Sequence, residues 1–524
     1  MRKKSALGIA CLGSLAFSSA VLAQTTITIT PDAGHDHSPN LRGVTPPPDA
    51  YQSVKHTRDV RHIPHLDGPG QDTVVQGTPS SSLAAATTAS AGFAGIGNGA
   101  YGFVPNAAPP DTNGAIGTTQ YVQWVNESFA VFDKVTHQPV LGPVAGNTLW
   151  KGFGGPCETR NDGDPIAKWD NIAKRWVLMQ FAVPTGGPYY QCIAVSQTAD
   201  ATGAYNRYAF QYTTFNDYPK VGVWPDGYYV TFNMFNGNTF VGAQVCAYDR
   251  AAMIAGNPAT QQCVQLSSSY GGVLPSDLDG ASTAPSGSPN YLVNFGTNKL
   301  NFWKFHVDWT TPTNSSFSVP LAIPVTSFAA ACGGGTCIQQ PGTTNQLDSL
   351  ADRLMYRLAY RQFADGHEAL LVTHAVAVGT GSKRSPAPAG VRWYELRNPA
   401  IAPAVYQQAT YSPDTTSRWM SSAAFDKAGN IAVGYSTSST SVNPGIRYST
   451  RAPGDPLGTL SNEVPVITGG GIQNGTLHRW GDYSTMTVDP VDDCTFWYTN
   501  EYQATTGSFN WNTWINSFKV SSCQ

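Results

Sequence analysis

From about residue 96 to the C-terminus, short apolar runs alternate with clusters of turn-forming residues. The runs are rich in Val, Ile, Tyr, Phe and Trp, which are the residue types that strands favour. Gly, Pro, Asn, Asp and Ser separate the runs, as tight turns require. We therefore predict strands over residues 120–126, 174–183, 189–196, 227–235, 290–295, 300–307, 369–378, 390–396, 430–436 and 495–502.

One segment fits two kinds of element. Residues 346–362, QLDSLADRLMYRLAYRQ, have a spacing that a helix could use, but no good N-cap precedes them, and their Tyr and Arg residues suit a strand equally well. The rest of the pattern has many short strands at regular spacing. Such a pattern is typical of an all-β fold, either a sandwich, a barrel or a propeller.

The chain also repeats itself. Each repeat has a polar residue, a short strand of small or apolar residues, a turn, and a second strand rich in aromatic and β-branched residues. We call the leading polar residues the head residues; they are Asp111, Asp164, Asp217, Asp279, Asp352, Arg418 and Asp482. In three repeats the head lies 12 residues before an aromatic residue, namely Trp176, Tyr229 and Tyr291.

Repeats of this kind predict a β-propeller, with seven blades as the best fit and six or eight as alternatives. A pair of β-sandwich domains is the competing architecture, but it would not need a repeated polar head. In a propeller, the innermost strand of each blade borders the central channel. We therefore expect equivalent head residues to converge on one mouth of that channel.

The N-terminal residues predict export. Arg2, Lys3 and Lys4 precede an apolar stretch that ends near Ala23–Gln24, as in a cleavable signal peptide over residues 1–23. Residues 24–95 are rich in Pro, Ser, Thr and Ala and are expected to form a low-complexity exported segment. The propeller is then expected to span residues 96–524, in a secreted protein of the periplasm or the extracellular space.

The cysteines and the composition agree with export. Outside the signal, eight cysteines remain, an even number that predicts disulfides between neighbours in the sequence: Cys157, Cys192, Cys246, Cys263, Cys332, Cys337, Cys494 and Cys523. The formal net charge is −3, which gives no basis for binding nucleic acid. No segment after the signal is apolar enough for a membrane span. We expect a monomer.

A ring of carboxylates has three chemical interpretations. It could bind Ca²⁺, which takes six to eight oxygen ligands. It could hydrolyse glycosidic bonds, because crowded carboxylates raise each other's pKa and so supply a protonated general acid. It could also cap the turns that enter the inner strands by accepting backbone N–H bonds. A turn cap does not explain why one head residue is Arg418.

Three segments carry a resemblance to known proteins. SQTADATGAY, with Ser196, Asp200, Gly203 and Tyr205, resembles the Asp-box hairpin of sialidase-type propellers. PPDTNGAIG and RWGDYSTMTVDP resemble segments of uncharacterised exported bacterial propeller proteins. The resemblance implies a β-propeller fold. The Asp-box is a structural turn, so it implies no catalytic residue here.

The leading hypothesis is a carbohydrate site at the axial mouth, acting on an extracellular polysaccharide or glycoconjugate by glycoside hydrolysis. The expected acid, base or pKa-tuning groups are Asp164, Asp217 and Asp482. Residues expected to contact the substrate are Arg353, Arg418, Trp419, Trp480, Asp111, Asp279 and Asp352.

Two alternatives stay open beside this hypothesis. A polysaccharide lyase could use Arg353 with a histidine, for which His367, His374 and His478 are the candidates. A non-catalytic binding or adhesion propeller could use the carboxylates to hold Ca²⁺ or only to cap turns.

Overall fold

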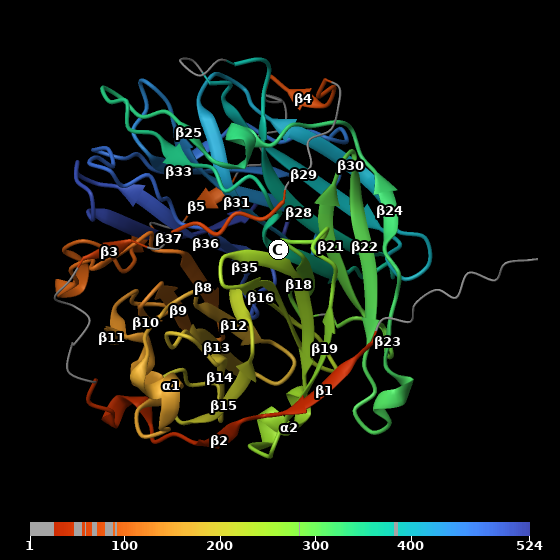
Figure 1. The fold of residues 1–524 in the computed structure, drawn as a ribbon. Helices are drawn as coiled ribbons and strands as arrows, with labels where there is room; N and C mark the ends of the chain where they lie inside the picture. The colour runs from red at the N-terminus through yellow and green to blue at the C-terminus, as the bar shows by residue number, and fades with distance from the viewer. Residues whose placement is uncertain are drawn as a thin grey trace, which may run out of the picture.

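The computed structural model describes residues 26–46, 55–57, 59–64, 71–78, 87–89, 92–281, 283–381 and 386–524. The predicted signal peptide, residues 1–23, lies outside the described residues. Within them, the fold is all-β, and its sheets are arranged around a central axis (Figure 1). No helix among the described residues has the length and apolar character needed to cross a bilayer.

Antiparallel meanders make up the body of the molecule. The first three are β8 (Thr112–Ile116), β9 (Gln120–Val125), β10 (Ser128–Asp133), β11 (Pro139–Ala145); β12 (Ile166–Asp170), β13 (Arg175–Ala182), β14 (Tyr189–Ser196), β15 (Tyr205–Tyr212); and β16 (Phe215–Val223), β17 (Tyr228–Asn236), β18 (Thr239–Tyr248), β19 (Thr260–Gln265). Two short helices connect strands here, α1 (Gly155–Thr159) and α2 (Arg250–Ala255).

The remaining meanders follow the same plan. They are β20 (Leu274–Leu278), β21 (Asn290–Gly296), β22 (Lys299–His306) with β23 (Ser316–Phe317) and β24 (Leu321–Pro324); β27 (Met355–Gln362), β28 (Glu368–Ala377), β29 (Ala389–Arg397), β30 (Ala404–Tyr411); β31 (Ser417–Phe425), β32 (Ile431–Ser438), β33 (Gly445–Arg451), β34 (Val464–Ile467); and β35 (Thr485–Val488), β36 (Thr495–Gln503), β37 (Trp511–Val520). A small hairpin joins β25 (Thr336–Ile338) to β26 (Leu347–Asp348).

The predicted strands are confirmed, and the ambiguous segment 346–362 forms strands β26 and β27. Strand β27 is buried over most of its length because neighbouring sheets cover both of its faces, so its apolar positions need not alternate. The inner strands β8, β12, β16, β20, β27, β31 and β35 contact one another in chain order, and β35 contacts β8. This closed ring is the hub of a β-propeller.

The number of blades stays a prediction. Strands β20 and β27 pair in parallel, which merges two meanders into one ten-stranded sheet. The parallel pairing also shows that these two inner strands run in the same direction. The residues that precede them therefore lie at one end of the hub, and the residues that follow them lie at the other.

Short N-terminal strands extend the outer edges of several sheets. They are β1 (Thr28–Pro31) on β19, β2 (Gly34–His37) on β15, β4 (Val75–Gln76) on β30, and β5 (Thr87–Ala89) and β6 (Phe93–Ala94) on β37. Pairing of this kind protects sheet edges that would otherwise be exposed. The predicted boundary between residues 95 and 96 stays a prediction.

The core and the disulfides also follow the meanders. Aromatic side chains fill the space between neighbouring sheets, as in the Trp224–Tyr360 contact at 4.7 Å between ring centroids. The predicted pairing of neighbouring cysteines is confirmed: Cys157–Cys192, Cys246–Cys263, Cys332–Cys337 and Cys494–Cys523. Each bond ties strands or loops that are close in sequence.

Candidate functional site

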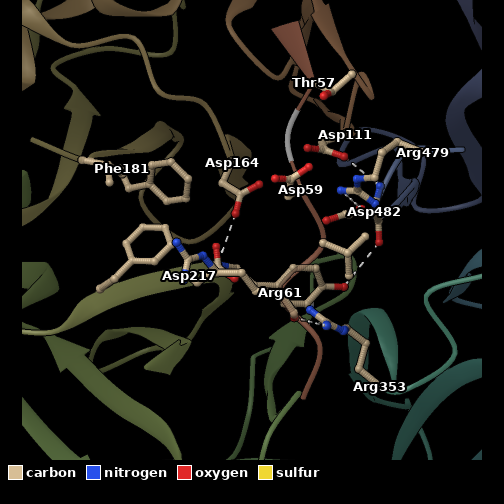
Figure 2. A pocket seen from close by; sticks show the side chains of 14 residues that line it. Thr57, Asp59, Arg61, Asp111, Asp164, Phe181, Asp217, Arg353, Arg479 and Asp482 are labelled. Atoms are coloured by element: carbon tan, nitrogen blue, oxygen red, sulfur yellow. Dashed lines mark hydrogen bonds and ion pairs between the residues drawn. The ribbon is translucent and has the colours of Figure 1, made fainter. Parts of the chain in front are cut away.

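A pocket of about 260 Å³ opens at the end of the hub where the inner strands begin (Figure 2). Most of its lining comes from residues just before β8, β12, β27 and β35 or in the first half of β16. The lining residues are Thr57, Asp59, Val60, Arg61, Asp111, Asp164, Phe181, Val183, Phe215, Asp217, Tyr218, Arg353, Arg479 and Asp482. The structure thus brings together four of the head residues, Asp111, Asp164, Asp217 and Asp482, with Arg353 beside them.

The backbone is strained where three of these strands begin. Asp111, Asp164 and Tyr218 have positive φ angles of 44°, 48° and 57°. A residue with a side chain pays about 1–3 kcal/mol for a rarely populated backbone conformation, so the surrounding contacts must hold it there. Such strain tends to concentrate at functional sites, which makes this end of the hub the first candidate.

Two of the four aspartates also accept hydrogen bonds from the backbone of an adjacent inner strand's segment. An Oδ atom of Asp111 accepts a bond from the Asp482 backbone N–H at 2.8 Å, and the other accepts one from Asn126 at 3.1 Å. Asp164 accepts a bond from the Tyr218 backbone N–H at 3.1 Å. Both carboxylates thus bind a backbone N–H of an adjacent inner strand's segment instead of capping their own turn, and these bonds fix how the carboxylates are oriented.

Asp217 sits at a β-bulge. The pairing of β16 with β17 shifts between Asp217 and Lys220, and bulges of this kind re-aim side chains next to sites. Loss of water and, after it, the charge on Asp164 raise the pKa of Asp217 to about 7, against the opposing charge on Arg353. At neutral pH, Asp217 therefore carries a proton for part of the time.

Asp482 pairs with Arg479, and the turn between these two residues is bound by a buried glutamate, Glu501. The Asp482 carboxylate pairs with Arg479 at 2.6 Å, and the intervening Gly481 N–H donates to Glu501 at 2.8 Å. Glu501 is buried, and burial raises its pKa to about 8. The charge on Asp482 adds to that rise, so a neutral Glu501 supports the turn that carries the ion pair.

Next to the pocket lining, a buried ammonium group lies between two aromatic rings. The Lys220 Nζ atom lies 3.4 Å from the Tyr218 ring centroid and 3.9 Å from that of Tyr483. Burial lowers the pKa of Lys220 to about 8, although Asp164 and Asp482 favour its charged form. The aspartates and this lysine thus form one electrostatic cluster.

Arg353 lines the pocket while its charge is committed to a neighbour. Its guanidinium binds both carboxylate oxygens of Asp352, at 2.6 and 3.1 Å, and its carbon centre lies 4.5 Å from the Tyr218 ring centroid. Arg353 holds the pKa of Asp352 down at about 2, against the effect of burial. Asp352 itself does not line the pocket but supports Arg353 from behind.

Three other predicted substrate contacts lie elsewhere. Arg418 is fully buried, is paired with Glu463 at 2.6 Å and Asp414 at 3.0 Å, and does not line the pocket. Trp419 and Trp480 are both completely buried, and their ring centroids are 5.6 Å apart. These tryptophans belong to the core, and the pocket's aromatic lining comes instead from Phe181, Phe215 and Tyr218.

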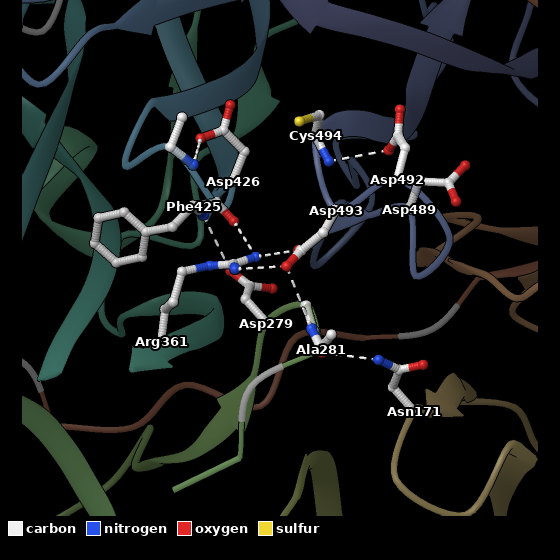
Figure 3. A network of polar contacts seen from close by, with 12 residues as sticks. Asn171, Asp279, Ala281, Arg361, Phe425, Asp426, Asp489, Asp492, Asp493 and Cys494 are labelled. Atoms are coloured by element: carbon white, nitrogen blue, oxygen red, sulfur yellow. Dashed lines mark hydrogen bonds and ion pairs between the residues drawn. The ribbon is translucent and has the colours of Figure 1, made fainter. Parts of the chain in front are cut away.

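Asp279 lies at the opposite end of the hub. It follows β20 instead of preceding it, so its side chain cannot reach the pocket. There it pairs with Arg357 at 2.6 Å and accepts the Phe425 backbone N–H at 3.0 Å. Figure 3 shows the surrounding network, in which Arg361 binds Asp493 at 2.6 Å.

None of the histidines proposed for a lyase lines the pocket. His374 is buried against Tyr394, at 3.0 Å from its hydroxyl, and burial lowers its pKa well below the usual value. His367 pairs with the exposed Asp365 at 2.5 Å, and His478 contacts the Gln346 carbonyl oxygen at 3.0 Å. Of the residues proposed for a lyase, Arg353 lines the pocket, and His367, His374 and His478 do not.

Sequence reasoning missed several pocket residues. Arg479 stands three residues before a head residue, a spacing that allowed its ion pair with Asp482 to be anticipated. Asp59 and Arg61 come from the N-terminal segment, and no local pattern marks them as part of a distant pocket. Within the described residues, no group of three or more His, Cys, Asp or Glu side chains is arranged to hold a metal ion.

The segment that resembles an Asp-box forms the turn between β14 and β15. Asp200 accepts bonds from the Thr202 N–H at 3.0 Å and from its hydroxyl at 2.7 Å, and Gln120 donates to it at 2.9 Å. This hairpin is away from the pocket, as a structural turn would be. The resemblance to propellers extends to the fold and not to any feature specific to sialidases.

Comparisons with known proteins describe the fold only. No protein-family model matches the sequence, and no curated protein matches it. Among solved structures, the polysaccharide lyase Uly1 aligns with a TM-score of 0.38 at 10% identity, over 88% of this chain and 100% of that one.

Two further structures show how varied the similar proteins are. An α-L-arabinanase from Penicillium chrysogenum complexed with arabinobiose aligns with a TM-score of 0.37 at 8% identity, over 83% of this chain and 100% of that one. The WD40 domain of SCAP from fission yeast aligns with a TM-score of 0.32 at 10% identity, over 78% of this chain and 83% of that one. A fold does not determine a function, so the functional argument rests on the site itself.

Proposed function

We propose that this protein is a secreted carbohydrate-active enzyme that hydrolyses glycosidic bonds in the axial pocket. The observation that carries the proposal is the pairing of Asp217 with Asp164 in one open pocket. Burial and the neighbouring carboxylate raise the pKa of Asp217 to about 7, near the value at which a general acid is most effective at neutral pH. Glycoside hydrolysis needs one such protonated carboxyl group beside a second carboxylate.

The roles follow from the contacts. Asp217 protonates the glycosidic oxygen as the bond to the leaving sugar breaks. Asp164, whose orientation is fixed by the Tyr218 N–H, acts on the opposite side as base or nucleophile. Asp482 adds to the negative charge that raises the pKa of Asp217, and it stabilises the positively charged sugar in the transition state.

The substrate is an extracellular polysaccharide or glycoconjugate. Arg353 and Arg479 offer N–H donors at the pocket wall, and Phe181 and Phe215 offer apolar surface for the faces of a sugar ring. Export fits the four disulfides, which persist in oxidising compartments, and the N-terminal signal-like sequence. No cofactor takes part in the proposed reaction, which needs only the two carboxyl groups and water.

The test is a screen of neutral and uronate-containing polysaccharides for new reducing ends and, in parallel, for unsaturated sugars. Wild type is compared with Asp217→Asn, Asp164→Asn and a control, Asp365→Asn, whose carboxylate is exposed at another part of the surface. The proposal predicts new reducing ends with wild type and the control, and their loss in the other two variants. Unsaturated products would show a lyase, and binding without cleavage would show a binding propeller.

A further inference from the structure

A segment of the N-terminal region crosses the mouth of the pocket. We call residues 55–57 and 59–64 the strap. At one end, β3 (His56–Thr57) pairs in parallel with β7 (Ala107–Ala108), and the His56 ring binds Glu127 at 2.7 Å. In Figure 1 the red-orange strap runs from β3 across the middle of the propeller, and in Figure 2 its ribbon runs between Asp164 and Arg479.

The far end of the strap is fixed by Asp352 and Arg353. The Ile63 backbone N–H donates to Asp352 at 3.1 Å, and an Arg353 Nη atom donates to the Arg61 carbonyl oxygen at 3.0 Å. His62 lies 3.5 Å from the same Asp352 carboxylate. The ion pair of Asp352 with Arg353, whose arginine lines the pocket, therefore also binds the strap.

Apolar contacts also anchor the far end of the strap. Ile63 is only 4% exposed and packs in a cluster with Phe181, Phe215 and Phe235. Gly272, with φ at +58°, lies so close that a Cβ atom there would be 3.2 Å from Ile63 and 2.6 Å from the Arg353 side chain. The strap and Arg353 can therefore pack closely against Gly272 because this residue has no side chain.

The strap also places charged side chains at the pocket. Arg61 donates to the Gly237 carbonyl oxygen at 3.0 Å, and its guanidinium carbon lies 4.8 Å from the Phe215 ring centroid. Asp59 and Arg61 both line the pocket, and Asp59 is exposed. Thr57 and Val60 of the strap line the pocket as well, and Asp59 and Arg61 are the two charged residues that the strap adds to the lining.

The pocket is closed below as well as bridged above. Lys220 and Tyr483 fill the hub under the aspartates, and the charged side chains of Lys168, Asp277 and Arg357 fill it beyond them. A volume of about 260 Å³ is just under the range of about 300–1,000 Å³ that holds a drug-sized ligand. Such a space admits a short terminal piece of a saccharide but no chain passing through.

We propose that the strap turns the axial site into a blind pocket that accepts only the end of a saccharide chain. On this view the enzyme is exo-acting, and Asp59 and Arg61 are specificity-determining residues that contact the terminal sugar. An enzyme that cuts in mid-chain needs a groove open on both sides, and the strap spans the mouth where such a groove would run. This inference rests on the proposed hydrolase function.

The test uses the polysaccharide that wild type cleaves fastest and two forms of its oligosaccharides, one blocked at each chain end. Exo-action predicts one short product from the earliest time points, little loss of viscosity, and a more than tenfold slower reaction with one blocked form. The strap variant is Arg61→Ala/Ile63→Ala, which removes the two side chains that hold the strap on Phe215. The control is Val75→Ala, in another N-terminal strand that pairs with β30 away from the pocket.

Loosening the strap is expected to raise the share of mid-chain cuts several-fold, while Val75→Ala leaves the product pattern unchanged. Circular dichroism and thermal unfolding establish that both variants are folded. If the double variant does not fold, Asp59→Ala and the blocked oligosaccharides with wild type still decide the matter. Wild type that yields a ladder of products and cuts both blocked forms would overturn the inference alone, whereas no cleavage of any polysaccharide would overturn the proposed function and the inference with it.

Discussion

The two ends of the hub contain similar residues but balance their charges differently. At the end where the inner strands begin, Asp111, Asp164, Asp217 and Asp482 face Arg479 and Lys220, because Arg353 is occupied by Asp352. The aspartates outnumber their partners, and the pKa of Asp111 and that of Asp217 are raised by burial and by neighbouring carboxylates.

At the other end the charges match. Lys168 and Arg357 bind Asp277, and Arg357 also binds Asp279 at 2.6 Å. Although burial opposes it, Arg357 and Lys168 hold the pKa of Asp277 below its usual value. Beyond this cluster, the network of Figure 3 joins loops from several sheets. Closely paired charges in a filled hub serve structure, and unbalanced charges around an open pocket can serve chemistry.

The largest expected effect is on catalysis at the open end. Asp217→Asn keeps the shape of the side chain but removes the transferable proton, so we expect kcat to fall about 100- to 10,000-fold. Stability should change little, because the pKa of Asp217 is raised and the native carboxyl is already close to neutral. Rate assays with wild type and variant, together with thermal unfolding, check both statements. A variant with full activity would remove Asp217 from the mechanism.

The matching change at the closed end should act on stability instead. Asp277→Asn leaves Lys168 and Arg357 buried with one carboxylate, Asp279, between them. Removing one partner of a buried ion pair costs about 3–5 kcal/mol. Denaturant unfolding of wild type and variant measures this loss. If Asp277→Asn were as stable as wild type, the contrast between the two ends would not hold.

The sequence predicts the open end well for a physical reason. Asp111, Asp164, Asp217 and Asp482 each stand just before or at the start of an inner strand, so strands arranged around one hub bring them together. The repeat therefore predicts that these four aspartates lie close together in space, even though they are 53 or more residues apart in the sequence. The strand pattern itself was equally readable, because each strand carries its own alternation or apolar run.

Two head residues, Asp279 and Arg418, lie elsewhere because their positions along the inner strand differ from the expected one. Asp279 has the expected distance to Tyr291, but β20 begins at Leu274, so the aspartate follows the strand instead of leading it. Arg418 lies within β31, opposite Thr437, and a shift of one residue turns a strand's side chain to the other face. The strap could not be foreseen, because two-residue strands carry no period and Ile63 meets Asp352 across 289 residues of sequence.

The pH profile should report the excess of carboxylates at the open end. Activity needs protonated Asp217, so kcat should fall about tenfold per pH unit above the pKa of about 7. Replacing Asp482 with Asn removes a charge that helps raise this pKa, so the descending limb should move to lower pH. The measurement is the rate as a function of pH for both proteins. A profile that stays flat to pH 9 would contradict the assignment of the acid.

Glu501 offers a smaller test of the layer beneath the pocket. Its pKa rises from 4.5 in the unfolded chain to about 8 in the folded protein, so the folded state holds the proton more tightly. Stability should therefore fall as the pH rises from about 4.5 to about 8. Glu501→Gln is permanently neutral, and we expect its melting temperature to exceed that of wild type by a few degrees at pH 8 but not at pH 5. Thermal unfolding at both pH values measures the difference.

The smallest expected effect concerns the strap. A hydrogen bond to Asp352 raises the pKa of His62, the charges of Asp352 and Asp348 add to this, and burial and Arg353 oppose it. A raised histidine pKa means that the contact stabilises docking at low pH and is lost as the pH rises through the folded pKa. Because the His62 side chain is 58% exposed, solvent screens the pair, and His62→Ala should cost about 0.5 kcal/mol or less. Hydrogen exchange at the Ile63 amide should quicken at high pH in wild type, beyond the intrinsic pH dependence, and be less pH-dependent in His62→Ala. Equal behaviour of the two proteins would mean that Ile63 and the backbone bonds alone hold the strap over the pocket.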